Sequence, residues 1–192
     1  MKRNLFTMAV GLLMLSSAAN AQLQKGNVLI GGDLAGFSLG LNDGSAFSMN
    51  ITPKAAWFVK DNLALGGYVD LGLATAKGAG TTVNYGVGGL GRYYFPSAEV
   101  AVARSTRFFL EANAGIQGVN VSGGGSTNGL GLGIGPGLAY FVTPNVALES
   151  LLKYNGIIGF GSSSTASLLQ LNLGFQIYLS GNKVKSEVQK LQ

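Results

Sequence analysis

Apolar residues alternate with polar or small ones along most of this chain, and this period of two is the feature that most constrains its fold. In the segment 166–179, leucine, phenylalanine and isoleucine fill every second position from Leu169, and glutamine, asparagine, glycine and tyrosine lie between them. Successive side chains of a β-strand point to opposite faces of the sheet, so this period is typical of strands with one apolar face. The chain therefore predicts an all-β fold.

Eight such strands are expected, because residues typical of turns separate the alternating segments. Two kinds of connection alternate along the chain, one rich in glycine, serine and threonine, as the two ends of an eight-stranded antiparallel up-and-down β-barrel require. The expected strands cover residues 25–37, 46–59, 63–76, 83–95, 107–121, 129–142, 146–158 and 166–179. The glycine-rich connections are expected at 41–45, 77–82, 122–127 and 161–165, and the others at 60–62, 96–106 and 143–145.

An internal repeat supports a ring of similar units. Residues 51–65 match residues 134–148 without gaps in the pattern I-x-P-x-x-A-aromatic-F-V-x-x-N-x-A-L. Each copy is predicted to form one hairpin. A hairpin cannot bury its apolar face alone, so repeated hairpins indicate a closed array.

The composition favours a membrane barrel over a soluble sandwich. Charged residues make up 11% of the chain, against roughly 25% in soluble domains, yet no stretch after the N-terminus approaches the ~20 apolar residues of a membrane helix. A soluble β-sandwich also alternates, but its outer polar face would carry many lysines and glutamates. Here the polar face holds mostly glycine, alanine, asparagine and glutamine. We therefore expect a transmembrane barrel whose polar face lines a narrow lumen.

Every charge inside an expected strand falls on the face opposite to the apolar one. A base that faces lipid at the membrane midplane costs roughly 2–4 kcal/mol, so a bilayer would enforce this segregation. Acidic and basic residues are equal in number, and we expect them to form a lumen charge network: Asp33, Lys54, Asp70, Arg92, Arg107, Glu111, Glu149 and Lys153.

Large aromatic residues on the apolar face gather beside the connections that are poor in glycine. Aromatic residues are enriched where a barrel crosses the membrane interface, so they are expected to form an interfacial girdle. In an eight-stranded barrel both termini lie at this same end, which in this class is periplasmic. The expected girdle consists of Trp57, Tyr93, Phe95, Phe108 and Tyr140.

Residues 1–21 are predicted to be a cleavable signal peptide. Two basic residues precede a short apolar core, and Ala19 and Ala21 are the small residues of an A-x-A cleavage site. The apolar core is too short to anchor the chain across a membrane. The barrel is then expected over 22–180, with a polar periplasmic tail over 181–192. The body between these ends is close to neutral, so no nucleic-acid partner is expected.

The signal peptide, the repeated hairpins and the last strand L-N-L-G-F-Q-I-Y (residues 171–178) resemble the outer-membrane β-barrel domain family. That family is similar in architecture to the outer-membrane protein A and W groups, and the resemblance covers residues 22–180. It implies a monomer in the cell outer membrane of a Gram-negative bacterium, with outer-membrane lipid and the barrel assembly machinery as partners. The chain departs from the pattern at its end, because such chains often stop on an aromatic of the last strand.

Enzymatic chemistry finds little support in the residues. The chain has no histidine and no cysteine, so a Ser-His site cannot form and the scattered carboxylates predict no metal site or cofactor. The G-x-G-x-x-G pattern at 86–91 lies inside an expected strand, where it cannot cradle a phosphate. Glu111 and Glu149 would suit acid–base work, but we favour their pairing with the lumen bases.

Two functions remain open on the sequence. The first is a non-enzymatic barrel with a structural or surface-interaction role, its lumen plugged by Tyr68, Phe109 and the eight charges. The second is a narrow channel or binding barrel for small or apolar molecules. Eight strands leave an interior that side chains fill or that holds one small ligand. The alternate glycines at 129–137 are expected to leave space in the lumen, which would favour the second function.

Overall fold

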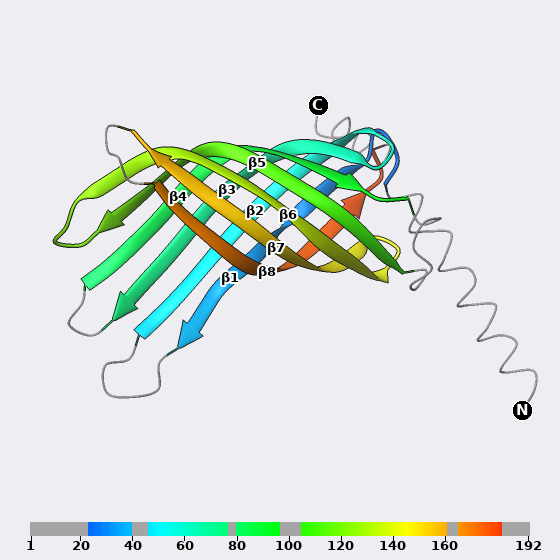
Figure 1. Ribbon diagram of the computed structural model, residues 1–192. Coiled ribbons are helices and arrows are strands. Elements are labelled where there is room, and N and C mark those ends of the chain that lie inside the picture. The colour runs from blue at the N-terminus through cyan, green and yellow to red at the C-terminus, as the bar shows by residue number, and fades with distance from the viewer. Residues whose placement is uncertain (1–22, 40–45, 77–79, 97–104, 161–164, 182–192) are drawn as a thin grey trace, which may run out of the picture.

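Eight antiparallel strands close into a barrel in the computed structural model, which describes residues 23–39, 46–76, 80–96, 105–160 and 165–181 (Figure 1). Each strand pairs with its neighbours in the chain, and β8 returns to pair with β1. The predicted eight-stranded up-and-down fold is confirmed. The strands are β1 (Val28–Leu39), β2 (Ala46–Lys60), β3 (Leu63–Ala76), β4 (Gly80–Tyr94), β5 (Thr106–Val121), β6 (Ser126–Thr143), β7 (Val146–Gly159) and β8 (Thr165–Leu179).

Three strand starts differ from the predicted ones by three residues, and the other boundaries agree within two residues. The first strand begins at Val28 rather than at residue 25, because Gly26 adopts a φ of 90° and the N–H of Asn27 donates to the carbonyl of Gln24, which makes a turn. β4 and β6 begin three residues earlier than predicted. The residues added to β4 include Thr81, and β-branched residues suit paired strands better than loops.

The two copies of the repeat form the same hairpin, as predicted. In β2–β3 the register shifts between Phe58 and Lys60, and in β6–β7 it shifts at the equivalent place, between Phe141 and Thr143. The repeated prolines have no N–H to donate, and pairing with the following strand is interrupted at both of them. One local sequence therefore makes two equivalent units of the ring.

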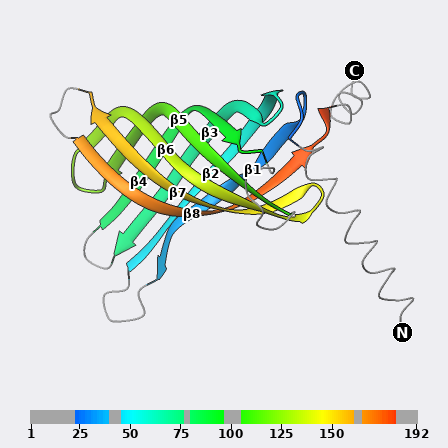
Figure 2. The same ribbon diagram turned by 45° about the vertical axis from the view of Figure 1, so that its right-hand side comes forward.

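The barrel has two distinct ends. The turn end carries the short β2–β3 and β6–β7 connections, the start of β1 and the end of β8. The loop end carries the connections after β1, β3, β5 and β7. Figure 2 shows β1 and β8 diverging toward the loop end. Their described pairing stops at Ala35 and Asn172, although β1 continues along β2 to Leu39 and β8 is paired with β7 from Thr165.

Burial follows the alternation on both faces of the sheet. Large apolar side chains of all eight strands, such as Leu71 with 55% of its surface exposed, cover the outside. The inward positions hold small, polar and charged residues together with an apolar cluster at the turn end. In the described part of the chain, no helix is long and apolar enough to cross a membrane.

Candidate functional site

The lumen is closed at the turn end by buried apolar and aromatic side chains, which we call the plug. Its rings contact one another, with centroids 5.0 Å apart for Phe141 and Tyr178 and 5.5 Å apart for Tyr94 and Phe109. Leu23 enters the plug from the segment before β1, where its carbonyl accepts a hydrogen bond from the N–H of Asn62. The plug consists of Leu23, Leu29, Phe58, Tyr94, Phe109, Phe141 and Tyr178.

Six of the eight predicted lumen charges form one continuous ion network next to the plug. It joins three acids to three bases, so its formal charges cancel. The pairs are Lys54–Asp33 (2.6 Å), Lys54–Glu111 (3.0 Å), Arg92–Glu111 (2.6 Å), Arg92–Glu149 (2.7 Å) and Lys153–Glu111 (3.4 Å).

Glu111 is the hub of the ion network. Its carboxylate, with 1% of the side chain exposed, contacts cations from β2, β4 and β7. Arg92 donates to Glu111 and Glu149 and lies with its Cζ 4.1 Å from the centre of the Phe109 ring. Buried charges are tolerated only when they are paired and hydrogen-bonded. The network meets that condition by drawing on strands from opposite walls of the barrel.

Two phenols join the plug to the ion network. The hydroxyl of Tyr178 donates to Glu149 at 2.8 Å, and the guanidinium of Arg92 donates to the hydroxyl of Tyr94 at 3.0 Å. The two hydroxyls are also 2.7 Å apart. Plug and network together therefore make one packed layer across the lumen.

The remaining two predicted charges lie outside the ion network. The carboxylate of Asp70 accepts a hydrogen bond from the hydroxyl of Thr52 at 2.8 Å, on the loop-end side. Arg107 is buried at the turn end, where its guanidinium donates to the carbonyl of Thr106 at 2.8 Å. The structure thus places all eight charges at inward positions, and six of them form the ion network.

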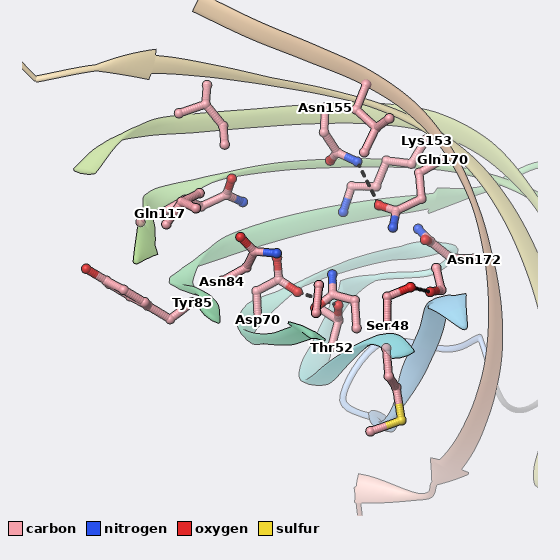
Figure 3. Close-up of a pocket in the computed structure, with 18 of the residues that line it drawn as sticks. Ser48, Thr52, Asp70, Asn84, Tyr85, Gln117, Lys153, Asn155, Gln170 and Asn172 are labelled. Carbon is pink, nitrogen blue, oxygen red and sulfur yellow. Dashed lines mark hydrogen bonds between the residues drawn. The ribbon is translucent and has the colours of Figure 1, made fainter. Parts of the chain in front are cut away.

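A cavity of about 340 Å³, with amide, hydroxyl and apolar groups on its walls, occupies the lumen on the loop-end side of the ion network. Figure 3 shows Thr52, Asp70 and Asn84 on one wall and Lys153 and Gln170 on the other, while the ring of Tyr85 points away. The amide side chains on its walls are Asn50, Asn84, Asn113, Gln117, Asn155, Gln170 and Asn172. The cavity reaches Gly36, beside the divergence of β1 and β8.

The glycines of β6 do not open this space, contrary to the expectation that they would leave room for a conduit. A Cβ on Gly137 would meet the ring of Phe109, and one on Gly131 would meet the side chain of Gln117. Large neighbouring side chains already lie over these glycines. The glycines allow the lumen to be packed rather than keeping it empty.

The five predicted girdle aromatics lie on the outside of the barrel near its turn end. Their exposed fractions run from 40% for Phe95 to 57% for Trp57. The rings of Tyr93 and Phe95 meet edge to face, with centroids 5.5 Å apart. The predicted cleavage residues Ala19 and Ala21, and the tail beyond Gly181, lie outside the described residues.

Sequence reasoning missed most of the plug and did not recognise the cavity. The inner aromatics Phe58, Tyr94, Phe141 and Tyr178 stand at inward positions of the alternating pattern. The amides stand at inward positions too, in the loop-end half of their strands. The alternation together with the distance from the turn would therefore have identified both the plug aromatics and the cavity amides. The alternation alone does not reveal which inward side chains leave a space between them.

No protein-family model matches the chain, and no curated protein sequence matches it. Solved structures do. Neisserial surface protein A, NspA, is 21% identical with a TM-score of 0.53, over 81% of this chain and 97% of that one. The outer membrane protein OprG from Pseudomonas aeruginosa is 13% identical with a TM-score of 0.51, over 82% and 98%. The chain has the fold of the small eight-stranded outer-membrane β-barrels.

Proposed function

We propose that this protein is a non-enzymatic integral barrel of the bacterial outer membrane with a structural or surface-interaction role, and that its lumen does not conduct. The observation that carries the proposal is the packed layer of plug and ion network. Five salt bridges between side chains no more than 9% exposed cross the lumen there. A solute would have to break buried ion pairs to pass.

The outer surface supports a membrane location. Exposed apolar side chains of all eight strands surround the barrel, and the charges within the described strands point inward or lie at strand ends. In water this surface would far exceed the apolar patches of ordinary soluble monomers. The two similar proteins, which are named a surface protein and an outer membrane protein, agree with this location.

The orientation follows from the girdle and the predicted signal peptide. The turn end faces the periplasm, and the loop end faces the cell exterior. Insertion in this orientation would involve the barrel assembly machinery, with lipid as the surrounding partner and a monomer as the working form.

The buried carboxylates favour a non-enzymatic role. Glu111 and Glu149 were the candidates for acid–base work, but both accept hydrogen bonds from Arg92 and each has 1% of its side chain exposed. A general acid or base must reach a substrate proton. These two carboxylates instead hold the lumen together.

Conductance of the refolded full-length protein in a planar bilayer tests the proposal. The expected result is a baseline without discrete opening steps. The double variant Arg92→Ser/Phe109→Ala, which thins the layer, serves as a control and is expected to produce steps when its folded band on a gel is retained. Regular opening steps from the unmodified protein would overturn the proposal in favour of the channel.

A further inference from the structure

The cavity at the loop end is rich in amide and hydroxyl groups, and closing the lumen does not require them there. Its walls carry seven amide side chains, the aliphatic hydroxyls of Ser48, Thr52 and Ser167 and two tyrosines, but only two formal charges. Those charges are of opposite sign. Lys153 is tied to the ion network through Glu111, and Asp70 is held by Thr52.

Three buried polar atoms on residues that line the cavity lack partners among the described residues, and they lie against glycines of the barrel wall. Tyr68 and Asn113 are both more than nine-tenths buried, and the hydroxyl of Tyr68 and the Oδ1 of Asn113 make no hydrogen bond there; the same holds for the Oδ1 of Asn50. Buried polar groups in folded proteins are almost always bonded to protein, water or ligand. The wall of this cavity is therefore a part of the lumen where the protein's own hydrogen bonds, among the described residues, do not satisfy every polar group.

The lining selects among the possible ligands. An apolar molecule would leave the amides unpaired, at about 1–3 kcal/mol for each buried group. A strongly charged molecule would face one carboxylate and one ammonium that cancel each other. An amide presents a donor and an acceptor side by side, and each hydroxyl of a polyol is also a donor and an acceptor.

We propose that the cavity is a binding site for a small uncharged polyol, of the size of a monosaccharide or a disaccharide. A volume of about 340 Å³ lies at the small end of the range for ligand sites. The amides on opposite walls contact successive hydroxyls, and Asp70 accepts from one of them. The site is blind, because Tyr68 and the ion network form its floor. A polyol therefore takes the place of the apolar ligand that the sequence left open for a binding barrel.

The test is a titration of the full-length protein, folded in a detergent without a sugar head group, with glucose, galactose, maltose and myo-inositol. Side-chain amide resonances in ¹⁵N–¹H NMR spectra are the readout. We expect saturable shifts of the cavity amides with at least one of these polyols. Glycine, putrescine and hexanol are expected to cause none. Binding in detergent does not depend on the membrane location or on conductance, so the two proposals fail separately.

Two neighbouring substitutions supply the matched control. Ala74 lines the cavity, and Ala74→Trp is expected to abolish the saturable shifts by filling it. Thr75 is exposed on the outer face at the same height, and Thr75→Trp is expected to leave the shifts unchanged. If Ala74→Trp does not fold, the pair Asn155→Leu/Gln170→Leu replaces two amides that bond each other at 3.5 Å.

The variant Asp70→Asn distinguishes binding of a polyol from binding of an ammonium compound. It keeps an acceptor oxygen and removes the charge, so polyol affinity is expected to fall by no more than about tenfold, in line with the loss of one charge-assisted hydrogen bond. Three results would overturn the proposal: no saturable shift with any of the four polyols, unchanged polyol binding by folded Ala74→Trp, or tighter binding of putrescine or glycine than of every polyol.

Discussion

Glu111 makes more salt bridges than any other residue of the ion network. Three cations from three other strands converge on its carboxylate, and none of them is its neighbour in the chain. The alternating pattern correctly indicated that all of these side chains point inward. It did not indicate which of them pair, because partners such as Lys54 and Glu111, 57 residues apart, meet only through the register of several intervening strands.

Replacing Glu111 with glutamine is expected to lower the free energy of unfolding by about 3–5 kcal/mol, the usual cost of breaking a buried ion pair on one side. The change keeps the shape of the side chain but leaves Lys54, Arg92 and Lys153 with too few anions. Urea unfolding, followed through the fluorescence of the single tryptophan, measures it.

Asp70→Asn is the control for this experiment, because the Asp70 carboxylate is bonded to the hydroxyl of Thr52 and lies outside the ion network. Its cost is expected to stay within about 1 kcal/mol. Equal losses from Glu111→Gln and Asp70→Asn would contradict the role of Glu111 as a hub.

At the scale of the strand, inward glycines set how closely neighbouring elements approach. Adjacent glycines of β3 make the point. A Cβ on inward Gly66 would collide with the backbone of Ala55 and Ala56 in β2, whereas one on Gly67 would meet nothing closer than the carbonyl of Gly88 at 3.4 Å. The glycine content was evident in the sequence, but its structural role was not. In a sequence, a glycine against which a neighbouring strand or side chain packs cannot be distinguished from one that leaves a gap.

Gly66→Ala is therefore expected to destabilise the barrel by about 1–3 kcal/mol, the range for overpacking. Gly67→Ala should be nearly neutral, since alanine also restricts the unfolded chain. Urea midpoints of the two variants, compared at the same detergent concentration, decide the matter. A larger loss from Gly67→Ala would mean that the two faces of β3 are assigned the wrong way round.

The two faces of β3 also differ in the charges they tolerate. Leu71 is 55% exposed on the outer face, and Asp70 beside it points into the cavity. Leu71→Arg is expected to cost roughly 2–4 kcal/mol near the midplane of a bilayer and to reduce the yield of folded protein in vesicles. Asp70→Asn is expected to fold as well as the unmodified chain. Equal folded yields would argue against lipid on the outer face.

For the molecule as a whole, strand number, order and closure were all predictable, because period two, alternating connections and the internal repeat point to one topology. The closure of the lumen at the turn end was not predictable from the sequence. Leu23 contributes to this closure from a segment without alternation, and its carbonyl accepts a hydrogen bond from the N–H of Asn62 in the β2–β3 turn, which no local pattern signals.

Cell fractionation tests the proposed location at this scale. The mature protein is expected in the outer-membrane fraction, with faster gel migration before boiling than after it, because a closed barrel resists detergent until heated. Recovery as a soluble periplasmic protein, or migration independent of heating, would contradict the proposed location.

The cross-lumen pairing has a consequence for the order of events during biogenesis. Lys54 can find Asp33 within one hairpin and Arg92 can find Glu111 within another, but Arg92–Glu149 and Lys153–Glu111 require strands that are distant in the chain. A partial barrel in which β7 has not yet reached β4 and β5 lacks both of these pairs. We therefore expect such intermediates to be disfavoured in the bilayer, which couples strand insertion to closure of the barrel.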